Sequence, residues 1–377
     1  MTTITILASG TRGDVQPYLA LGAGLKRAGY EIRMLASDDF APLAAEAGLA
    51  FRSTGESVEA MLQSEEWRAV AESGNFLRIL GRMRAEMRRR GGEAAARLPE
   101  LLDGTDLLLA GMGGLGGGFA IARQRGIPIL QAYLFPFAPT SQFASPLAPR
   151  LSLGGPLNRL SFSATRQLFW QTSKLPDQLI RRQLGMVRGP FGGPFRELDR
   201  LPALYGYSPA VLPRPADWPE RFRVAGYWFL DEPAGWAPPP ALEAFLDAGE
   251  PPVYIGFGSM GSRDPREAGR IALEALALTG QRGILAAGWG GLTLDDLPDN
   301  VHLISSIYHS WLFPRMRAVV HHGGAGTTAA GLRAGAPSVI VPFMGDQPFW
   351  GRRVADLGAG PAPIPRKQLT AERLAAA

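Results

Sequence analysis

Short apolar segments alternate with helical stretches along this chain, and the whole alternation occurs twice. Ile4–Ser9 and Tyr30–Ser37 open the first run, and Pro252–Met260 opens the second. Between them lies Asp231–Pro252, which contains three consecutive prolines. Strands that alternate with helices favour a parallel sheet covered by helices. Because 377 residues exceed the usual size of one domain, we expect two α/β domains joined by a linker.

The expected boundaries follow from this pattern. We place an N-terminal domain at residues 1–225, a linker with a short internal helix at 226–252, and a C-terminal domain at 253–377. Residues 136–225 are rich in Pro, Phe and Trp, and are expected to form long aromatic loops that build a ligand pocket or pack between domains. Leu369–Ala377 begins a helix and stops, so a C-terminal helix is expected to be missing.

Composition excludes several classes of function. The chain has no cysteine, which rules out disulfides and cysteine-based metal or redox sites. Four histidines leave little for a zinc site, and no metal is predicted; they are His302, His309, His321 and His322. The N-terminus reads as a first strand instead of a signal peptide, and no apolar run reaches the roughly 18 residues of a membrane span. The cytoplasm is the expected location.

The positive charge is concentrated in one stretch. The formal net charge is +5, and the segment Arg82–Arg90 is arginine-rich. Apolar residues recur at helical spacing through it, which predicts a helix with one apolar and one basic face; they are Phe76, Leu80, Met83 and Met87. A solvated helix face is the main interpretation, and peripheral contact with an anionic membrane is the alternative. Nucleic acid is disfavoured, since no aromatic residues interleave with the arginines.

A glycine motif after one strand resembles a dinucleotide-binding turn. Gly111–Gly116 reads GMGGLG and matches G-x-G-x-x-G. Such a site also needs an acidic residue about 20 positions on, at the end of the next strand. The strand IPILQAYLFPF, Ile127–Phe137, contains none. We therefore interpret these glycines as allowing a helix to pack close to the sheet.

The segment His321–Thr328, HHGGAGTT, also follows a strand and opens a helix. A helix N-terminus presents unpaired N–H groups and the positive end of the helix dipole, which suit a phosphate. His322 is placed to donate a hydrogen bond to a phosphate oxygen. A structural turn with a satisfied histidine is the alternative. One strand later come Asp346 and Gln347, a carboxylate and an amide that suit sugar hydroxyls.

The stretch from His321 to Trp350 resembles the donor-binding signature of nucleotide-sugar glycosyltransferases with the GT-B fold, two facing Rossmann-like domains with parallel sheets. It is similar to the sterol glucosyltransferase branch and to bacterial enzymes that glycosylate hydrophobic natural products. Ser9–Leu25, Ala225–Asp231 and Pro251–Met260 fit the same branch. The resemblance spans both ends and the linker, and it is weak across residues 136–225.

The resemblance implies a catalytic base in the N-terminal loop. Many relatives have a histidine there in an H-x-x-P pattern, whereas this chain reads Asp14-Val-Gln-Pro17 and has no histidine before His302. Asp14 is therefore the candidate base. The alternative is an aspartate that only caps a turn before a helix.

The resemblance also implies a donor site. The diphosphate is assigned to Ser259, His322 and the N–H groups of the segment Gly324, Ala325, Gly326, Thr327 and Thr328. The sugar is assigned to Asp346, Gln347 and Trp350, although Trp350 also suits a packing role. The nucleobase is assigned to Ile307, Tyr308 and Trp289, and the acceptor pocket to Phe135, Phe137, Phe143, Met83 and Met87.

The function implied is inverting transfer of a hexose to a hydroxyl of a hydrophobic acceptor, such as a sterol or natural-product aglycone. The expected donor is UDP-glucose, with dTDP-glucose as the alternative, and no cofactor besides this co-substrate is expected. A single displacement follows from one base and no evident nucleophile. A nucleotide-sugar epimerase on the same fold and a non-catalytic helper of a partner transferase are the rival functions.

Overall fold

The computed structural model describes the whole chain except residues 56, 58–59, 62–63, 65, 68–75, 149–153, 258–264 and 287–296. The side chains of Met83 and Met87 also lie outside the described set. The chain divides into two compact units. The N-terminal unit comprises Met1–Val58 and Phe76–Leu230, and the C-terminal unit comprises Glu59–Asn75 and Asp231–Ala377.

The N-terminal unit is built on a seven-stranded parallel sheet with the strand order β3-β2-β1-β4-β5-β6-β7. Its strands are β1 (Thr3–Leu7), β2 (Glu31–Ala36), β3 (Ala50–Ser53), β4 (Leu107–Ala110), β5 (Ile129–Tyr133), β6 (Ala203–Tyr205) and β7 (Phe222–Val224). All five residues of β1 are buried, as expected for a central parallel strand covered on both faces.

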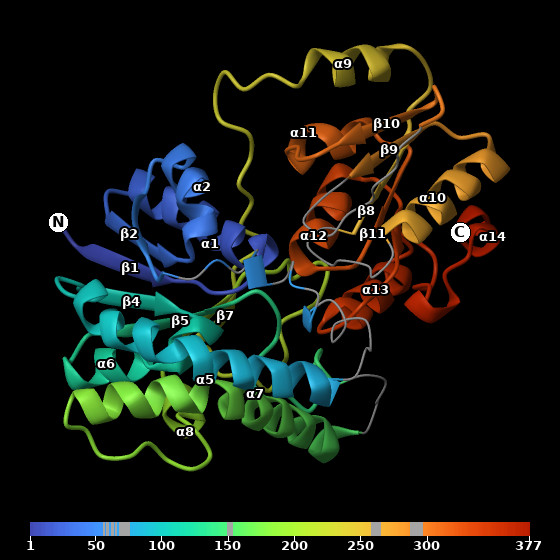
Figure 1. The fold of residues 1–377 in the computed structure, drawn as a ribbon. Helices are drawn as coiled ribbons and strands as arrows, with labels where there is room; N and C mark the ends of the chain where they lie inside the picture. Colours follow the sequence, from blue (N-terminus) through green and yellow to red (C-terminus); the bar gives the residue numbers. More distant parts are fainter. Residues whose placement is uncertain are drawn as a thin grey trace. The chain divides into compact units, whose positions relative to one another are not determined.

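Helices cover both faces of this sheet. The helices are α1 (Arg12–Arg27), α2 (Ala41–Glu46), α5 (Phe76–Leu101), α6 (Gly118–Gln124), α7 (Gly155–Gln183) and α8 (Phe195–Leu198). In Figure 1, α1 and α2 lie on one side of the sheet, and α5, α6 and α7 lie on the other. Right-handed crossovers require this arrangement, because the chain moves from β1 toward β2 in one direction and from β4 toward β5 in the other.

The expectation of long loops across residues 136–225 is wrong for much of that range. Helix α7 runs for 29 residues from Gly155 to Gln183 and packs along α5. Its buried positions include Phe162, Trp170 and Ile180, each no more than 1% exposed. Pro156 lies in the first turn, where a missing N–H costs nothing, and Pro176 is accommodated inside the helix. Aromatic loops remain on either side of α7.

The glycine motif after β4 serves close packing, as predicted. A Cβ on Gly114 would lie 2.6 Å from the Phe119 ring, and one on Gly118 would lie 2.8 Å from Leu7. Gly117, at φ +123°, would meet Ile180 at 2.1 Å. The motif forms the short 3-10 helix η2 (Met112–Gly116) and leads into α6, whose residues 118–122 are all buried. Glycine is required because no side chain fits between these elements.

The C-terminal unit is built on a five-stranded parallel sheet with the order β10-β9-β8-β11-β12. Its strands are β8 (Val253–Gly256), β9 (Gly283–Ala286), β10 (Val301–Ile304), β11 (Ala318–His321) and β12 (Ser338–Ile340). Alternate residues point to opposite faces. Tyr254 packs in one core with Leu312 and Phe313, whereas Ile255 packs in the other with Leu276 and Leu374.

The helices of this unit follow the same alternation. They are α9 (Pro240–Asp247), α10 (Pro265–Thr279), α11 (His309–Leu312), α12 (Ala325–Ala334), α13 (Gln347–Asp356) and α14 (Ala371–Ala376). The predicted short helix at the C-terminal end is α14, and it packs against α10. None of the described helices is both long enough and apolar enough to cross a membrane.

The segment predicted as a linker, residues 226–252, is divided between the two units at Leu230 and Asp231. Arg333 at the end of α12 holds the Asp231 carboxylate, with one N···O distance of 2.5 Å. The Ser310 hydroxyl donates to Glu232 at 2.6 Å. Helix α9 lies within the segment, as predicted, and its Leu242 is fully buried in the core of the C-terminal unit. Asp231, Glu232 and helix α9 are thus held against the rest of the C-terminal unit.

Candidate active site

The candidate ligand site of the C-terminal unit lies at the carboxyl ends of β8 and β11. These strands are neighbours, with Gly256 opposite His321, while the chain continues from them to β9 on one side and β12 on the other. In open α/β sheets, ligands bind at the point where the strand order reverses in this way. The loop after β8 contains Ser259, which lies outside the described residues. The loop after β11 is the predicted phosphate turn.

Two glycines shape that turn. Gly323 has φ +84°, and a Cβ there would lie 2.6 Å from Ile340 and 3.1 Å from the Gln347 carbonyl oxygen. A Cβ on Gly324 would lie 2.5 Å from Nε2 of His322. The His322 ring therefore lies over the backbone that begins α12. Any larger residue at either position would displace the histidine or the loop.

The start of α12 leaves N–H groups for a ligand. Gly324 is the N-cap and supplies no capping side chain. Within the described part of the chain, no acceptor faces the N–H groups of Gly324, Ala325, Gly326 or Thr327. The Thr328 N–H differs, because it donates to the Gly324 carbonyl at 2.9 Å and closes the first helical turn. The Thr328 N–H was predicted to bind the diphosphate, and this prediction is wrong because that N–H is already bonded. The N–H groups of the four preceding residues remain available to an anion.

Three buried polar atoms in this segment have no hydrogen-bond partner among the described residues. They are Nε2 of His321, Nδ1 of His322 and the Thr328 hydroxyl oxygen. Burial lowers the pKa of His322 to about 4 and that of His321 well below its ordinary value. Both imidazoles are therefore neutral near pH 7, and His321 uses Nδ1 to accept the Gly323 N–H at 3.1 Å. Buried polar groups without a hydrogen-bond partner are rare in folded proteins. Three of them in one segment indicate that the segment is arranged to bind a ligand.

Gln347 and Asp346 follow β12, and much of their hydrogen-bonding capacity is used within the unit. The Gln347 side-chain oxygen accepts the N–H groups of Phe343 and Met344 at 2.7 and 2.9 Å. The Asp346 carboxylate accepts the Trp350 indole N–H at 2.7 Å. Gln347 is left with its NH2 group, which has no acceptor among the described residues. The Asp346 carboxylate is an acceptor that can take several hydrogen bonds at once.

Trp350 is fully buried. Its ring packs edge-on against Phe349, with ring centroids 5.1 Å apart. This placement gives Trp350 a packing role and leaves no surface of the ring for a sugar. Its contribution to the site is to orient the Asp346 carboxylate through the indole N–H.

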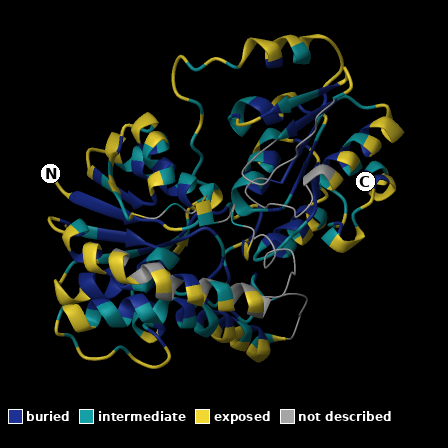
Figure 2. Ribbon diagram, viewed as in Figure 1, coloured by how far each residue is buried: buried dark blue, intermediate teal, exposed yellow. Residues whose placement is uncertain are grey.

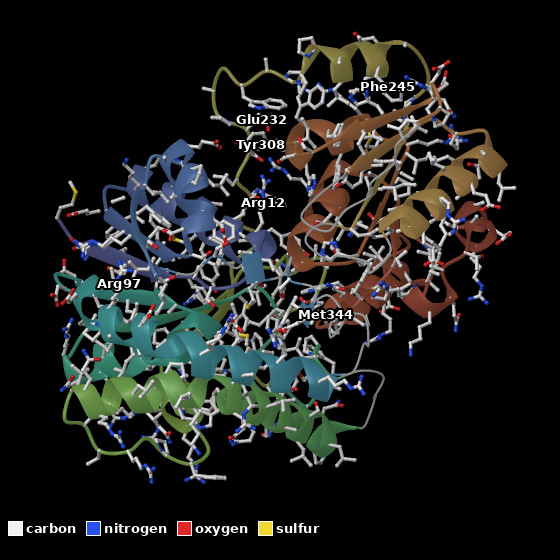
Figure 3. The ribbon with its side chains drawn as sticks, in the orientation of Figure 1. Arg12, Arg97, Glu232, Phe245, Tyr308 and Met344 are labelled. Carbon is white, nitrogen blue, oxygen red and sulfur yellow. The ribbon has the colours of Figure 1, made fainter. Side chains whose placement is uncertain are left out.

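The predicted nucleobase residues lie in the loop after β10. Ile307 is 9% exposed and belongs to the apolar core around α11. Tyr308 is half-buried, and its ring lies edge-on to Trp236 with centroids 5.3 Å apart. Figure 3 labels Tyr308 together with Glu232, which shares this part of the C-terminal unit, and Met344 in the loop after β12. Trp289 lies outside the described residues.

Asp14 is the third residue of α1, at the strand-order reversal of the N-terminal sheet between β1 and β4. One carboxylate oxygen, Oδ2, accepts the Thr11 N–H at 2.8 Å and the Thr11 hydroxyl at 3.0 Å. The structure thus shows the capping role that was the alternative interpretation. No donor among the described residues is bonded to Oδ1, so a base role is compatible with the cap.

The environment of Asp14 favours its protonated form relative to a free aspartate. The residue is in contact with solvent. Protein atoms around its carboxyl group nevertheless raise the pKa of that group by desolvation, and the hydrogen bonds from Thr11 partly oppose this rise. Gly10 makes room for the carboxylate, because a Cβ there would lie 2.4 Å from Oδ2. Its φ of +129° is also unfavourable for other residues. Sequence reasoning missed Gly10, although a glycine four residues before the aspartate was a visible signal.

The predicted acceptor residues differ in burial. Phe137 is 2% exposed and packs against Tyr133 and Phe195 in the core of the N-terminal unit. Phe135 and Phe143 are half-buried. The structure brings Phe135 and Phe137 together, with ring centroids 6.2 Å apart, while Phe143 contacts Phe162 of α7. Nothing is described for the side chains of Met83 and Met87.

Asp217 is a polar residue near this region that the sequence did not reveal. It accepts the Thr140 hydroxyl at 2.6 Å, the Ser141 N–H at 2.8 Å and the Arg159 guanidinium at 2.8 Å. Although partial burial raises the pKa of its carboxyl group, the hydrogen bonds outweigh that and hold it well below its usual value. Asp217 therefore fixes the loop that carries Phe143 to the start of α7. Among the described residues, no group of three acidic or histidine side chains could hold a metal ion.

Two family models match this chain. Residues 4–86 match the glycosyltransferase family 28 N-terminal domain. Residues 286–377 match the C-terminal domain of erythromycin biosynthesis protein CIII-like proteins. The first match includes β1, α1 and Asp14, and the second includes β11, α12 and α13.

Curated relatives align along nearly the whole chain. A sterol 3-beta-glucosyltransferase of Arabidopsis thaliana, UGT80B1, is 36% identical over 98% of this chain and 61% of the relative. A sterol 3-beta-glucosyltransferase of Cryptococcus neoformans is 35% identical over 99% of this chain and 25% of the relative. The chain therefore spans about three fifths of the plant protein and a quarter of the fungal one.

Solved structures share the fold at lower identity. The kitacinnamycin glycosyltransferase matches with a TM-score of 0.68 at 18% identity, over 100% of this chain and 89% of that one. The calicheamicin glycosyltransferase CalG4 matches with a TM-score of 0.65 at 21% identity, over 100% and 88%. The spinosyn rhamnosyltransferase SpnG, complexed with thymidine diphosphate, matches with a TM-score of 0.63 at 18% identity, over 100% and 90%.

These likenesses agree with two parallel sheets, each with a strand-order reversal, and with a phosphate-type turn at the reversal of the second. They confirm the resemblance found in the sequence. The chain has the fold of the GT-B glycosyltransferases, and its sequence is similar to those of the sterol glucosyltransferases.

Proposed function

We propose that this protein transfers a hexose from a nucleoside diphosphate sugar to a hydroxyl group of a hydrophobic acceptor, with inversion at the anomeric carbon. The observation that carries this proposal is the turn between β11 and α12. It combines four N–H groups without acceptors in the described chain with a neutral histidine laid over the helix start. Such a group of donors suits the charge that develops on a departing diphosphate.

The reaction is a single displacement. The acceptor oxygen forms a bond to the anomeric carbon while the bond from that carbon to the diphosphate oxygen breaks, and the electron pair leaves with the diphosphate. Asp14 accepts the proton of the acceptor hydroxyl through Oδ1, while Thr11 holds Oδ2. A raised pKa makes the carboxylate a better proton acceptor than a free aspartate. One base and one displacement give inversion.

The sugar is proposed to be recognised by the Gln347 NH2 group and by the Asp346 carboxylate, both in the segment after β12. The Gln347 NH2 group donates, and the Asp346 carboxylate accepts, from hydroxyls of the hexose. Glucose from UDP-glucose is the proposed donor, because the curated relatives are sterol glucosyltransferases. The thymidine diphosphate complex of a structural neighbour keeps dTDP-glucose as the competing donor. A sterol-like or polyketide-like aglycone is the proposed acceptor.

The test is incubation of the chain with UDP-glucose and with dTDP-glucose, each against a panel of sterols and aromatic aglycones, followed by mass spectrometry. The proposal predicts that at least one acceptor gains the mass of one anhydrohexose. Conversion of the nucleotide sugar without any acceptor would instead indicate an epimerase. If no pair gives a product although the nucleotide binds, the protein is a non-catalytic helper and the proposal fails.

A further inference from the structure

The connection from α7 to α8 exposes apolar side chains to an unusual degree. This loop, Gly185–Gly193, carries Val187 at 85% exposure and Phe191 at 79%. Apart from the terminal Met1, they are the most exposed large hydrophobic side chains in the described part of the chain. The loop is the yellow-green segment along the lower edge of Figure 1, and Figure 2 shows it as largely exposed. Exposed apolar surface costs free energy in water, so such a loop indicates a contact that covers it.

The loop backbone is held in place. The Trp170 indole N–H donates to the Phe191 carbonyl at 3.1 Å, and the Met186 N–H donates to the Arg181 carbonyl at 2.8 Å. Gly193, at φ +84°, lies against the Trp170 ring, where a Cβ would come within 2.9 Å. Trp170 itself is 1% exposed. The outward position of Val187 and Phe191 is therefore set by the buried core of the unit.

The exposed charges around the loop are predominantly positive, although the carboxylate of Asp177 lies close to Gly189. The Lys174 ammonium lies 4.9 Å from the centre of the Phe191 ring. Arg182, Arg188 and Arg196 are exposed, and residues 178–196 contain no acidic side chain. Arg181 is the exception among these cations, because it pairs with Asp177 at 2.8 Å. Exposed apolar side chains surrounded by cations are complementary to an anionic membrane, whose acyl chains lie beneath negatively charged headgroups.

We propose that loop Gly185–Gly193 docks on anionic membranes, with Val187 and Phe191 inserted among the acyl chains and the surrounding lysine and arginines on lipid phosphates. Two side chains are far too small an area for a stable protein interface, which needs about 1,000 Å². The same two side chains are sufficient for a reversible, peripheral lipid contact that charge reinforces. Such a contact would bring the N-terminal unit to the place where hydrophobic molecules dissolve, whether or not the protein transfers sugar to them.

The test is co-sedimentation of the full chain with vesicles of phosphatidylcholine, with and without phosphatidylglycerol. We expect binding to the anionic vesicles that weakens as salt is added, because exposed charges are screened. Replacing both tips, Val187→Ala with Phe191→Ala, should weaken this binding about tenfold or more, since the apolar area that enters the bilayer is lost. The Arg188→Gln variant should weaken binding to anionic vesicles and leave the weak binding to neutral ones unchanged.

Leu278→Ala is the matched control, because Leu278 is 59% exposed on α10 of the C-terminal unit. It should bind vesicles as the unchanged chain does. All variants should keep the melting temperature, since the substituted side chains are exposed. Equal vesicle binding by the double variant and the unchanged chain would overturn the proposal, as would no binding by the unchanged chain. A loss of dimers in the double variant without vesicle binding would also overturn it, and would assign the loop to an interface between copies.

Discussion

At the scale of single residues, the position of the His322 ring depends on Gly324. The ring lies over the helix start because Gly324 has no side chain, and the low pKa keeps the ring neutral near pH 7. A neutral imidazole donates one hydrogen bond, and it adds no charge to the diphosphate site. The positive character of the site then comes from backbone N–H groups and the helix dipole.

Replacing His322 by alanine should weaken the binding of UDP and dTDP roughly tenfold to a hundredfold, because one hydrogen bond to a charged oxygen is lost. Isothermal titration calorimetry on the full chain measures this directly. The control is His302→Ala, which removes a half-buried histidine that packs against Phe245. Equal nucleotide affinity of His322→Ala and the unchanged chain would remove His322 from the donor site.

A substitution at Gly10 tests whether the position of the Asp14 carboxylate matters for catalysis. Alanine at Gly10 would place a Cβ 2.4 Å from Asp14 Oδ2 and strain the backbone at φ +129°. The Gly29→Ala variant has a similar strain, at φ +92°, but meets no atom within 4 Å. Both variants should lose about 1 kcal/mol or more of unfolding free energy, whereas only Gly10→Ala should lower kcat. A kcat unchanged in Gly10→Ala would show that the carboxylate position is not critical.

The two adjacent histidines make stability depend on pH. The folded pKa of His322 is about 4, below its ordinary value, and the pKa of His321 is also well below its ordinary value. Between about pH 6.5 and pH 4 the unfolded chain therefore binds protons that the folded chain does not. This contribution to stability is complete above pH 6.5 and is lost as the pH falls. Urea unfolding across this range should show a shallower decline in His322→Gln, and an identical decline would contradict the low pKa.

At the scale of elements, the loop between β12 and α13 combines support and recognition in one side chain. Gln347 holds two loop N–H groups with its oxygen and leaves its NH2 group for the ligand. Sequence reasoning assigned the residue to the sugar from the pattern alone. It had no means of finding the loop-holding bonds, because these depend on how the loop folds back onto α13.

Gln347→Glu separates these two roles. The carboxylate keeps an acceptor for both loop N–H groups but has no NH2 donor. We expect a melting temperature within a few degrees of the unchanged chain, together with a larger loss of affinity for UDP-glucose than for UDP. Gln347→Leu, which removes the acceptor as well, should lower the melting temperature clearly. If Gln347→Glu binds the sugar nucleotide and UDP with unchanged relative affinity, the amide does not contact the sugar.

Helix α7 shows why some elements escape sequence reasoning. Phe162, Trp170 and Ile180 are buried in it, but the prolines and polar residues between them suggested loops. Pro156 is harmless in the first turn, and Pro176 is tolerated inside because the helix packs along α5. Tertiary packing of this kind overrides local propensity. The strands and the turn after β11 were predictable because buried parallel strands and glycine turns depend mainly on local sequence.

At the scale of the whole molecule, two α/β units were predictable from the repeated alternation, and both sheets are indeed parallel. The boundary was harder to predict. Asp231 and Glu232 belong to the C-terminal unit because Arg333 and Ser310, far along the chain, hold them. Such long-range pairs leave no local signal. The same limit applies to Trp350, whose burial follows from the packing of α13 and not from its place after the Asp-Gln pair.

The division into two units also divides the proposed chemistry. The leaving group belongs to the C-terminal unit, and proton transfer belongs to Asp14 of the N-terminal unit. A variant of Asp14 should therefore lower the rate of transfer and spare the binding of the nucleotide, which is proposed for the C-terminal unit. Asp14→Asn is the sharpest such variant, because asparagine keeps an oxygen to accept the Thr11 N–H but is a far weaker base.

The most direct measurement compares hexose transfer by the unchanged chain and by Asp14→Asn, with the product followed by mass spectrometry and UDP binding measured alongside. The account predicts that the unchanged chain adds one hexose to its acceptor. It predicts that Asp14→Asn binds UDP equally well while its kcat falls by about 10²–10⁴-fold. Transfer by Asp14→Asn at the rate of the unchanged chain would contradict the account.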